Sequence, residues 1–219
     1  MGVYIRVENL TKVIKNNIIL DNIELRLEEG KIYGFRGKNG SGKTMLFRTI
    51  CGLIKPTEGQ VVINGEVLGK DISFPREIGI LIENPNFLND LTGYKNLKYL
   101  ANIKKIIGDK EICEAINRVG LDSKDKRKYK KYSLGMKQRL GIAQAIMESP
   151  KIIILDEPTN ALDTEGIALL NKILKEYKAK NHIILIANHD KEELENIADE
   201  IFLVENGKIL EKKLINNEV

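Results

Sequence analysis

Residues 37–44 read Gly37-Lys38-Asn39-Gly40-Ser41-Gly42-Lys43-Thr44 and match the pattern G-x-x-x-x-G-K-[ST]. An apolar segment at 32–35 precedes them with the character of a strand, and a helical run from Lys43 to about Leu53 follows. The glycines let backbone N–H groups turn toward an anion, and the start of the helix adds its positive dipole end. In such a loop the lysine faces the β- and γ-phosphates, and the Thr44 hydroxyl binds Mg²⁺. The pattern therefore predicts a nucleotide-phosphate site rather than a chance glycine turn.

Two adjacent carboxylates follow the apolar run 152–155, which has the character of a strand buried on both faces of a parallel sheet. Open α/β sheets bind ligands at the carboxyl ends of their strands, where the phosphate loop (residues 37–44) also lies. Asp156 suits Mg²⁺, bound directly or through water, and Glu157 can polarise an attacking water. Alone, the pair would read as a charged turn before Pro158. Beside a phosphate loop, it predicts a metal and water site.

Each of the two histidines lies at one end of the next apolar segment, 183–187. His189 follows the segment, so parallel strands would bring it to the same rim as Asp156, where an imidazole can reach a γ-phosphate. His182 precedes the segment and would lie on the opposite rim. We therefore expect His182 to be a surface or capping residue.

The order of patterned segments predicts one α/β domain with a mostly parallel sheet. Strand patterns dominate the N-terminal part, and Asn-Gly pairs at 64–65 and 206–207 predict hairpins. Residues 92–147 turn helical inside this pattern, which favours a lobe inserted at about 83–150. The core would then comprise residues 1–82 and 151–219.

The composition is ordinary for a globular chain of 219 residues, with 42% hydrophobic residues and a net charge of +4. Cys51 and Cys113 lack metal or redox spacing, and we expect both to be reduced, buried hydrophobes. The first ten residues do not resemble a signal peptide. No apolar run approaches the about 20 residues of a membrane helix, so a membrane function would require a partner.

Further motifs along the chain resemble those of the ATP-binding cassette (ABC) family, in the order typical of that family. Tyr132-Ser133-Leu134-Gly135-Met136-Lys137-Gln138-Arg139 resembles its signature motif, which we call the signature segment. Asn160-Ala161-Leu162-Asp163 resembles its D-loop, and His189 its switch histidine. The resemblance covers essentially the whole chain. It implies a P-loop nucleotidase core with a mostly parallel sheet, an N-terminal antiparallel β subdomain and an inserted helical lobe.

The resemblance also implies a mechanism in which two cassettes pair head to tail around two Mg-ATP. Ser133 and Gly135 would touch the γ-phosphate bound by the partner, while Glu157 and His189 would serve catalysis. The residues implied to bind ATP are Gly37, Lys38, Asn39, Gly40, Ser41, Gly42, Lys43, Thr44, Met45, Glu83, Ser133, Leu134, Gly135 and Asp163. Those implied to bind Mg²⁺ are Thr44, Glu83 and Asp156.

The chain departs from the family's pattern at five positions, which are Leu134 and Met136 in the signature segment, Glu83, Ile14 and Met45. Leu134 replaces a glycine, and Met136 and Glu83 replace glutamines. A carboxylate at Glu83 can still ligate Mg²⁺. Ile14 replaces the aromatic that stacks on adenine, and Met45 replaces a hydroxyl near the α-phosphate. We therefore expect ATP to be held more by its phosphates than by its base.

Within the family, Glu83 together with the sequence Ser-Leu-Gly-Met-Lys-Gln at 133–138 resembles Gram-positive exporters of antimicrobial peptides and lantibiotic-immunity systems. We expect a motor subunit that works with a membrane-spanning subunit on a separate chain, at the cytoplasmic face of the membrane. The alternatives are a soluble nucleotide-gated clamp on nucleic acid or ribosomes, and a binding-only regulator. The clamp is disfavoured because the chain has one cassette and no sustained heptads, and we expect no direct nucleic-acid contact. The regulator is disfavoured because the catalytic residues are intact.

Two surface features leave alternatives open. The basic run Lys124–Lys131 is either a solvated loop or a patch that attracts nucleotide or anionic lipid. Phe87, Leu88 and Leu91 stand in the otherwise polar segment 84–91. Either they pack within their own lobe, or they form the docking site for a short helix of the membrane subunit, as the family resemblance implies.

Overall fold

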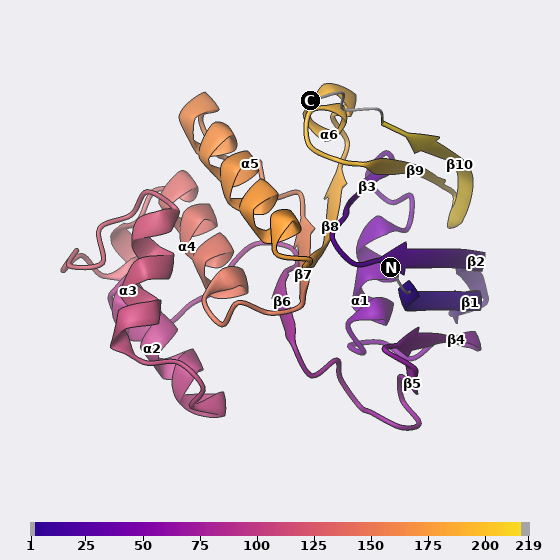
Figure 1. The fold of residues 1–219 in the computed structure, drawn as a ribbon, viewed down its shortest axis with the longest axis horizontal. Coiled ribbons are helices and arrows are strands. Elements are labelled where there is room, and N and C mark those ends of the chain that lie inside the picture. The colour runs from indigo at the N-terminus through magenta and orange to yellow at the C-terminus, as the bar shows by residue number, and fades with distance from the viewer. Residues whose placement is uncertain (1–2, 216–219) are drawn as a thin grey trace.

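The computed structural model describes residues 3–215, which form two β-sheets and a helical lobe (Figure 1). The larger sheet has the strand order β10-β9-β3-β8-β7-β6. Adjacent strands in this sheet are parallel, except that β10 runs antiparallel to β9. The strands are β3 Ile32–Arg36, β6 Ile78–Leu81, β7 Ile152–Asp156, β8 Ile183–Asn188, β9 Glu200–Glu205 and β10 Lys208–Leu214. The mostly parallel sheet expected from the sequence is confirmed.

Strands β7 and β8 are buried along their whole length because both faces of the sheet are covered. Side chains alternate between the faces of a strand. Ile153 and Leu155 pack with the lobe and with α5 (Thr164–Ala179), while Ile152 and Ile154 pack with α1 (Lys43–Ile50) and the second sheet. The continuous apolar runs of the sequence are thus explained.

The second sheet is the expected antiparallel β subdomain, with the strand order β2-β1-β4-β5. Its strands are β1 Val3–Ile14, β2 Asn17–Glu28, β4 Glu58–Ile63 and β5 Glu66–Val67. Asn-Gly pairs form the predicted hairpins, with positive φ at Asn64 and Gly65 and at Asn206 and Gly207. Helix α1 lies between the two sheets (Figure 1). The start of this helix is therefore fixed beside the ends of the central strands.

The lobe comprises α2 (Gly93–Lys104), α3 (Asp109–Arg118), the 3₁₀ turn η1 (Tyr129–Lys131) and α4 (Leu134–Ile146). These elements lie between β6 and β7 in the chain and form one side of the molecule (Figure 1). A short helix, α6 (Lys191–Glu195), precedes β9. Helix α1 ends at Ile50, earlier than the predicted Leu53, because Gly52 adopts a positive φ of 78° that stops the helix.

The two cysteines differ, so the expectation that both are buried was wrong for one of them. Cys51 is 3% exposed, and burial raises the pKa of its thiol to about 12. Cys113 is only half-buried, on the outer part of α3. His182 is half-buried at the start of β8, where its Nδ1 lies 2.7 Å from the carbonyl oxygen of Pro150. It therefore lies at the opposite strand end from His189, as expected.

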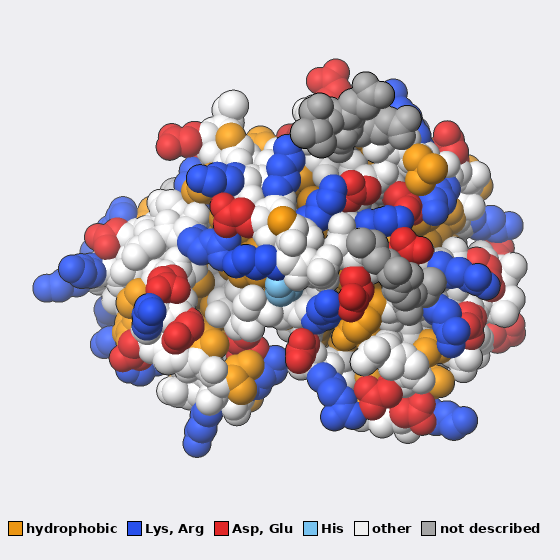
Figure 2. Space-filling view, in the orientation of Figure 1, with side chains coloured by type: hydrophobic (Ala, Val, Ile, Leu, Met, Phe, Trp, Pro, Cys, Tyr) orange, Lys and Arg blue, Asp and Glu red, His pale blue; other side chains and the backbone are white. Residues whose placement is uncertain are grey.

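Much of the basic run is paired locally. Lys128 and Lys130 lie 3.5 and 2.7 Å from the carboxylate of Asp90, and Arg127 lies 2.8 Å from that of Asp125. Figure 2 shows basic and acidic side chains interspersed across the visible face. These pairs favour the solvated loop over an anion-binding patch. No helix within residues 3–215 is both long and apolar enough to cross a membrane.

Candidate functional site

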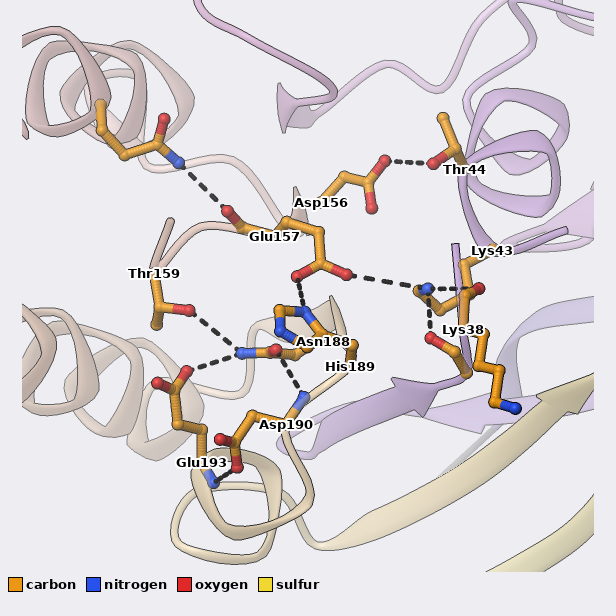
Figure 3. Close-up of polar contacts among 12 residues, drawn as sticks. Lys38, Lys43, Thr44, Asp156, Glu157, Thr159, Asn188, His189, Asp190 and Glu193 are labelled. Carbon is orange, nitrogen blue, oxygen red and sulfur yellow. Dashed lines mark hydrogen bonds and ion pairs between the residues drawn. The ribbon is translucent and has the colours of Figure 1, made fainter. Parts of the chain in front are cut away.

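The phosphate loop connects the end of β3 to the start of α1. Its glycines are required by the geometry, because a Cβ at Gly37 would lie 2.3 Å from the carbonyl oxygen of Val204. Gly42 caps α1 with a φ of 110°, which side chains rarely tolerate. The ammonium of Lys43 donates to the carbonyl oxygens of Gly37 and Lys38, at 2.7 and 3.3 Å (Figure 3). The buried ammonium of Lys43 therefore links the end of the phosphate loop to its beginning.

Asp156 and Thr44 meet although 112 residues separate them. The Thr44 hydroxyl donates to Oδ2 of Asp156 at 2.5 Å (Figure 3). The other carboxylate oxygen, Oδ1, is buried and has no hydrogen-bond partner in the described part of the chain. Burial raises the pKa of Asp156, the charge of Glu157 adds to the rise, and the Thr44 hydrogen bond opposes it.

A hydroxyl beside an orphaned carboxylate oxygen is the donor chemistry that Mg²⁺ prefers. Within residues 3–215, no group of three or more His, Cys, Asp and Glu side chains is placed to hold a metal. A magnesium ion at Thr44 and Asp156 would therefore take its remaining ligands from phosphate oxygens and water. That is the usual arrangement for Mg²⁺ in nucleotide enzymes, so these residues fit the ion.

Glu157 lies between the phosphate loop and His189. Its Oε2 lies 2.9 Å from Nδ1 of His189, and its Oε1 lies 3.7 Å from the ammonium of Lys43 (Figure 3). The Glu157 backbone has a positive φ of 48°, which turns its side chain away from the line of β7. A carboxylate held between a cation and an imidazole is placed to accept a proton at the phosphate loop.

Asn188 directly precedes His189 and holds the turn around it, and it was missed by the sequence analysis. Its amide donates to Thr159 Oγ1 at 3.1 Å and to Glu193 Oε2 at 2.7 Å, and its Oδ1 accepts from the Asp190 backbone (Figure 3). Asn188 is buried at the end of β8. The available signal was a polar residue that ends an otherwise apolar strand.

Two further residues were missed, Gln138 on α4 and Arg48 on α1. The buried amide of Gln138 donates to the carbonyl oxygens of Glu157 and Pro158. The guanidinium of Arg48 lies 2.5 Å from Oε1 of Glu83. The signal for Gln138 was an amide inside the signature segment, whereas Arg48 carried no local signal.

Most of the phosphate loop, Asp156, Glu157 and the two further residues line one open groove of about 650 Å³, which we call the nucleotide groove. Its lining comprises Ile19, Asn39–Met45, Arg48, Glu83, Asn84, Gln138, Asp156, Glu157 and Asn160. Gly37 and Lys38 line a smaller hollow of about 330 Å³, together with His189. Ile19 from β2 and Met45 from α1 are the large apolar side chains of this lining. Ile14 is not part of it and is 37% exposed at the end of β1.

The signature segment and Asp163 are not among the lining of the nucleotide groove. Ser133 caps α4, and its hydroxyl accepts from the Met136 N–H at 3.2 Å. Leu134 is 73% exposed beside it. Asp163 caps α5 and accepts from the Gly166 N–H at 2.9 Å. The structure therefore unites the phosphate loop with Glu83, Asp156 and Glu157, but leaves Ser133, Leu134, Gly135 and Asp163 outside this groove.

A family model described as "ABC transporter" matches residues 20–160, which is more than half of the chain. The chain belongs to the ABC transporter family. Similar proteins are ATP-binding subunits of such transporters. This chain is therefore an ATP-binding cassette and an ATPase of that family. The recognition made from the sequence is thereby confirmed.

The cassette is 50% identical over 205 residues to the Bacillus subtilis (strain 168) "uncharacterized ABC transporter ATP-binding protein YybJ", with 94% of each chain covered. It is 38% identical over 210 residues to the Streptococcus pyogenes "lantibiotic transport ATP-binding protein SrtF", which covers 95% of this chain and 90% of SrtF. A solved structure, the dimeric cassette MJ0796 in a post-hydrolysis state bound to ADP and Pi, superposes with a TM-score of 0.86. That match is 24% identical and covers 98% and 100% of the two chains, and it supports the fold.

Proposed function

We propose that the cassette drives a peptide exporter by hydrolysing ATP between two head-to-tail copies, and that a separate membrane subunit carries the cargo. The observation that carries this proposal is the placement of Glu157 between Lys43 and His189, beside the Thr44–Asp156 pair. This arrangement supplies an anion cradle, a metal position and a proton acceptor in one groove. The relation to SrtF, a lantibiotic transport protein, supports peptides as the cargo class.

In this proposal, the loop N–H groups and Lys43 bind the phosphates of ATP. Thr44 and Asp156, with Glu83 lining the same groove, would hold Mg²⁺, which would neutralise phosphate charge during transfer. Glu157 orients the attacking water and accepts its proton. His189 holds the carboxylate of Glu157 through Nδ1 and offers its other edge to the γ-phosphate.

The signature segment supports the pairing of two cassettes. Ser133 starts α4, and an exposed helix N-terminus attracts an anion. Because this end lies outside the chain's own nucleotide groove, we assign it to the ATP of a partner cassette. Asp163, at the start of α5, belongs to the same proposed interface. The dimeric state named for MJ0796 supports this assignment.

A second groove of about 700 Å³ offers a place for the membrane subunit, and we call it the lobe groove. Glu83 and Arg48 line it at one side, and Leu53, Phe87, Leu88 and Tyr99 supply apolar surface. Occupation of this groove would place the cassette at the cytoplasmic face of the membrane through its partner. Since Glu83 lines both grooves, docking there can act on the metal position.

The test is the variant Glu157→Gln in the purified chain. We expect unchanged ATP affinity, turnover reduced about a hundredfold or more, and a dimer that persists in ATP, measured by light scattering. The matched control is Glu192→Gln, an exposed glutamate on α6, which should hydrolyse ATP like the unaltered chain. Turnover near normal in Glu157→Gln would refute the role of Glu157.

The transport assignment needs a second measurement. A neighbouring gene that encodes about six apolar runs of 20 residues would be the expected membrane subunit. Co-expression should give a complex that exports a lantibiotic-type peptide from loaded vesicles in an ATP-dependent manner. A complex that moves peptide inward would contradict the export direction while leaving the motor role intact.

A further inference from the structure

The backbone of Glu157 adopts a conformation that a glutamate does not favour by itself. Its φ of 48° lies in the left-handed region. Such a residue persists only where surrounding contacts hold it. One contact comes from β8, because the Glu157 N–H donates to the Ala187 carbonyl oxygen at 2.9 Å.

Gln138 provides a second hold from another part of the molecule. Its Nε2 donates to the Pro158 carbonyl oxygen at 3.0 Å and to the Glu157 carbonyl oxygen at 3.3 Å. The residue is only 6% exposed and belongs to α4, in the helical lobe. The Glu157 N–H is therefore bonded to the core, and the carbonyl oxygens of Glu157 and Pro158 are bonded to the lobe.

The same turns of α4 also hold the far end of the segment 157–163. Nη2 of Arg139 lies 2.8 Å from Oδ1 of Asp163, which caps α5. A Cβ on Gly135 would lie 2.8 Å from the Ala161 carbonyl oxygen, so the two backbones are in close approach. The first turns of α4 and the segment 157–163 therefore form one connected unit.

We propose that Gln138 is a positioning residue for hydrolysis, which fixes the Glu157 peptide to the helix that begins at Ser133. The inference rests on the proposed role of Glu157 in activating water. Any shift of the start of α4 would be passed through the Gln138 amide to the Glu157 backbone. Binding of the partner's ATP at the signature segment would then move α4 and, through Gln138, align the Glu157 carboxylate of the same chain.

The first experiment replaces Gln138 with Met, which keeps the length of the side chain and removes its donor. Misplacement of a catalytic group by about 1 Å can cost a hundredfold in rate. We expect kcat for ATP to fall about tenfold or more. KM for ATP should change less than about threefold, because the phosphate loop is untouched. The control Gln60→Met alters an exposed glutamine on β4 that contacts Glu8, and it should leave both constants unchanged.

The second experiment combines Gln138→Met with Glu157→Gln. If Gln138 acts through Glu157, the Met substitution should have no further effect on the residual single-turnover rate once Glu157 is altered. Equal losses in both backgrounds would overturn the proposal, and so would a normal kcat in Gln138→Met. Melting curves establish that each variant is folded, and Gln138→Glu replaces the Met variant if that one does not fold.

The two proposals fail in different ways. Near-normal turnover in Glu157→Gln alone removes Glu157 from the mechanism and with it the basis for Gln138. A strong loss in Glu157→Gln, together with a normal Gln138→Met, leaves the proposed function standing and removes only the positioning role.

Discussion

The guanidinium of Arg48 lies 2.5 Å from the carboxylate of Glu83, and both residues line the nucleotide groove and the lobe groove. Glu83 has a positive φ of 62°, and its side chain is 60% exposed. The pair is specific to a carboxylate at this position, because a glutamine would carry no charge for Arg48 to neutralise. Arg48 and Mg²⁺ would therefore compete for Glu83.

This competition predicts a change in the Mg²⁺ requirement. Exposed ion pairs contribute about 0.2–1 kcal/mol, so Arg48→Ala should lower the half-saturating Mg²⁺ concentration for nucleotide binding by up to about fivefold. Glu83→Gln should raise it, and in that background Arg48→Ala should have no further effect. Fluorescent-nucleotide titrations with Mg²⁺ provide the measurement, with Arg76→Ala, which loses an ion pair to Glu66, as control. Identical Mg²⁺ curves for Arg48→Ala and the unaltered chain would exclude the competition.

Base discrimination should be poor, because no aromatic residue lines the nucleotide groove described above. Tyr33 cannot supply a stack, since it is fully buried and its hydroxyl is bonded to the Glu28 backbone. We expect kcat/KM for GTP within about tenfold of that for ATP, a difference of about 1.4 kcal/mol. Ile19→Tyr, which would place an aromatic ring in the groove lining, should widen the difference in favour of ATP. A hundredfold preference for ATP in the unaltered chain would show that another group reads adenine.

The cysteines should differ in reactivity with a thiol reagent. Burial raises the pKa of Cys51 to about 12, so at pH 8 its thiolate is scarce and inaccessible. Cys113 is half-buried and should be modified first. Mass spectrometry after brief alkylation of the native chain should find the label at Cys113, and at Cys51 only after unfolding. Equal labelling of both residues in the native chain would contradict the packing of Cys51.

The central strands could be predicted from the sequence, because the apolar runs at 152–155 and 183–187 correspond to strands β7 and β8, which are buried on both faces. It also predicted that Asp156 would lie near the phosphate loop, because the carboxyl ends of parallel strands share one rim. The turn of the first hairpin was not predicted. Lys15 and Asn16 form it with positive φ values, without the glycine that signals such turns.

The contacts that position the site were harder to predict because they depend on how the lobe is set against the core. Gln138 reaches Pro158 from α4, and Arg48 reaches Glu83 from α1. Neither periodicity nor motif spacing fixes the orientation of those helices. The segment around Phe87 shows the same limit, because the sequence could not decide between lobe packing and partner docking.

Neighbouring apolar side chains of this region differ in their exposure. Phe87 is half-buried, and its ring packs edge-on against Tyr129 with 5.3 Å between centroids. Leu88 and Tyr99 also line the lobe groove but are 54% and 64% exposed. Phe87 therefore packs within its own lobe, whereas Leu88 and Tyr99 have most of their surface exposed.

We expect Phe87→Ala to destabilise the isolated cassette by about 1–3 kcal/mol, which is below the cost for a fully buried phenylalanine, and also to weaken assembly. The double variant Leu88→Ala with Tyr99→Ala should leave the melting temperature nearly unchanged and still reduce recovery of the membrane subunit, because exposed anchors contribute mainly to binding. Co-purification and melting curves of the same preparations measure both effects. Normal assembly of the double variant would place the membrane subunit elsewhere on the cassette, and an unchanged melting temperature in Phe87→Ala would mean that its contact with Tyr129 contributes little to the fold.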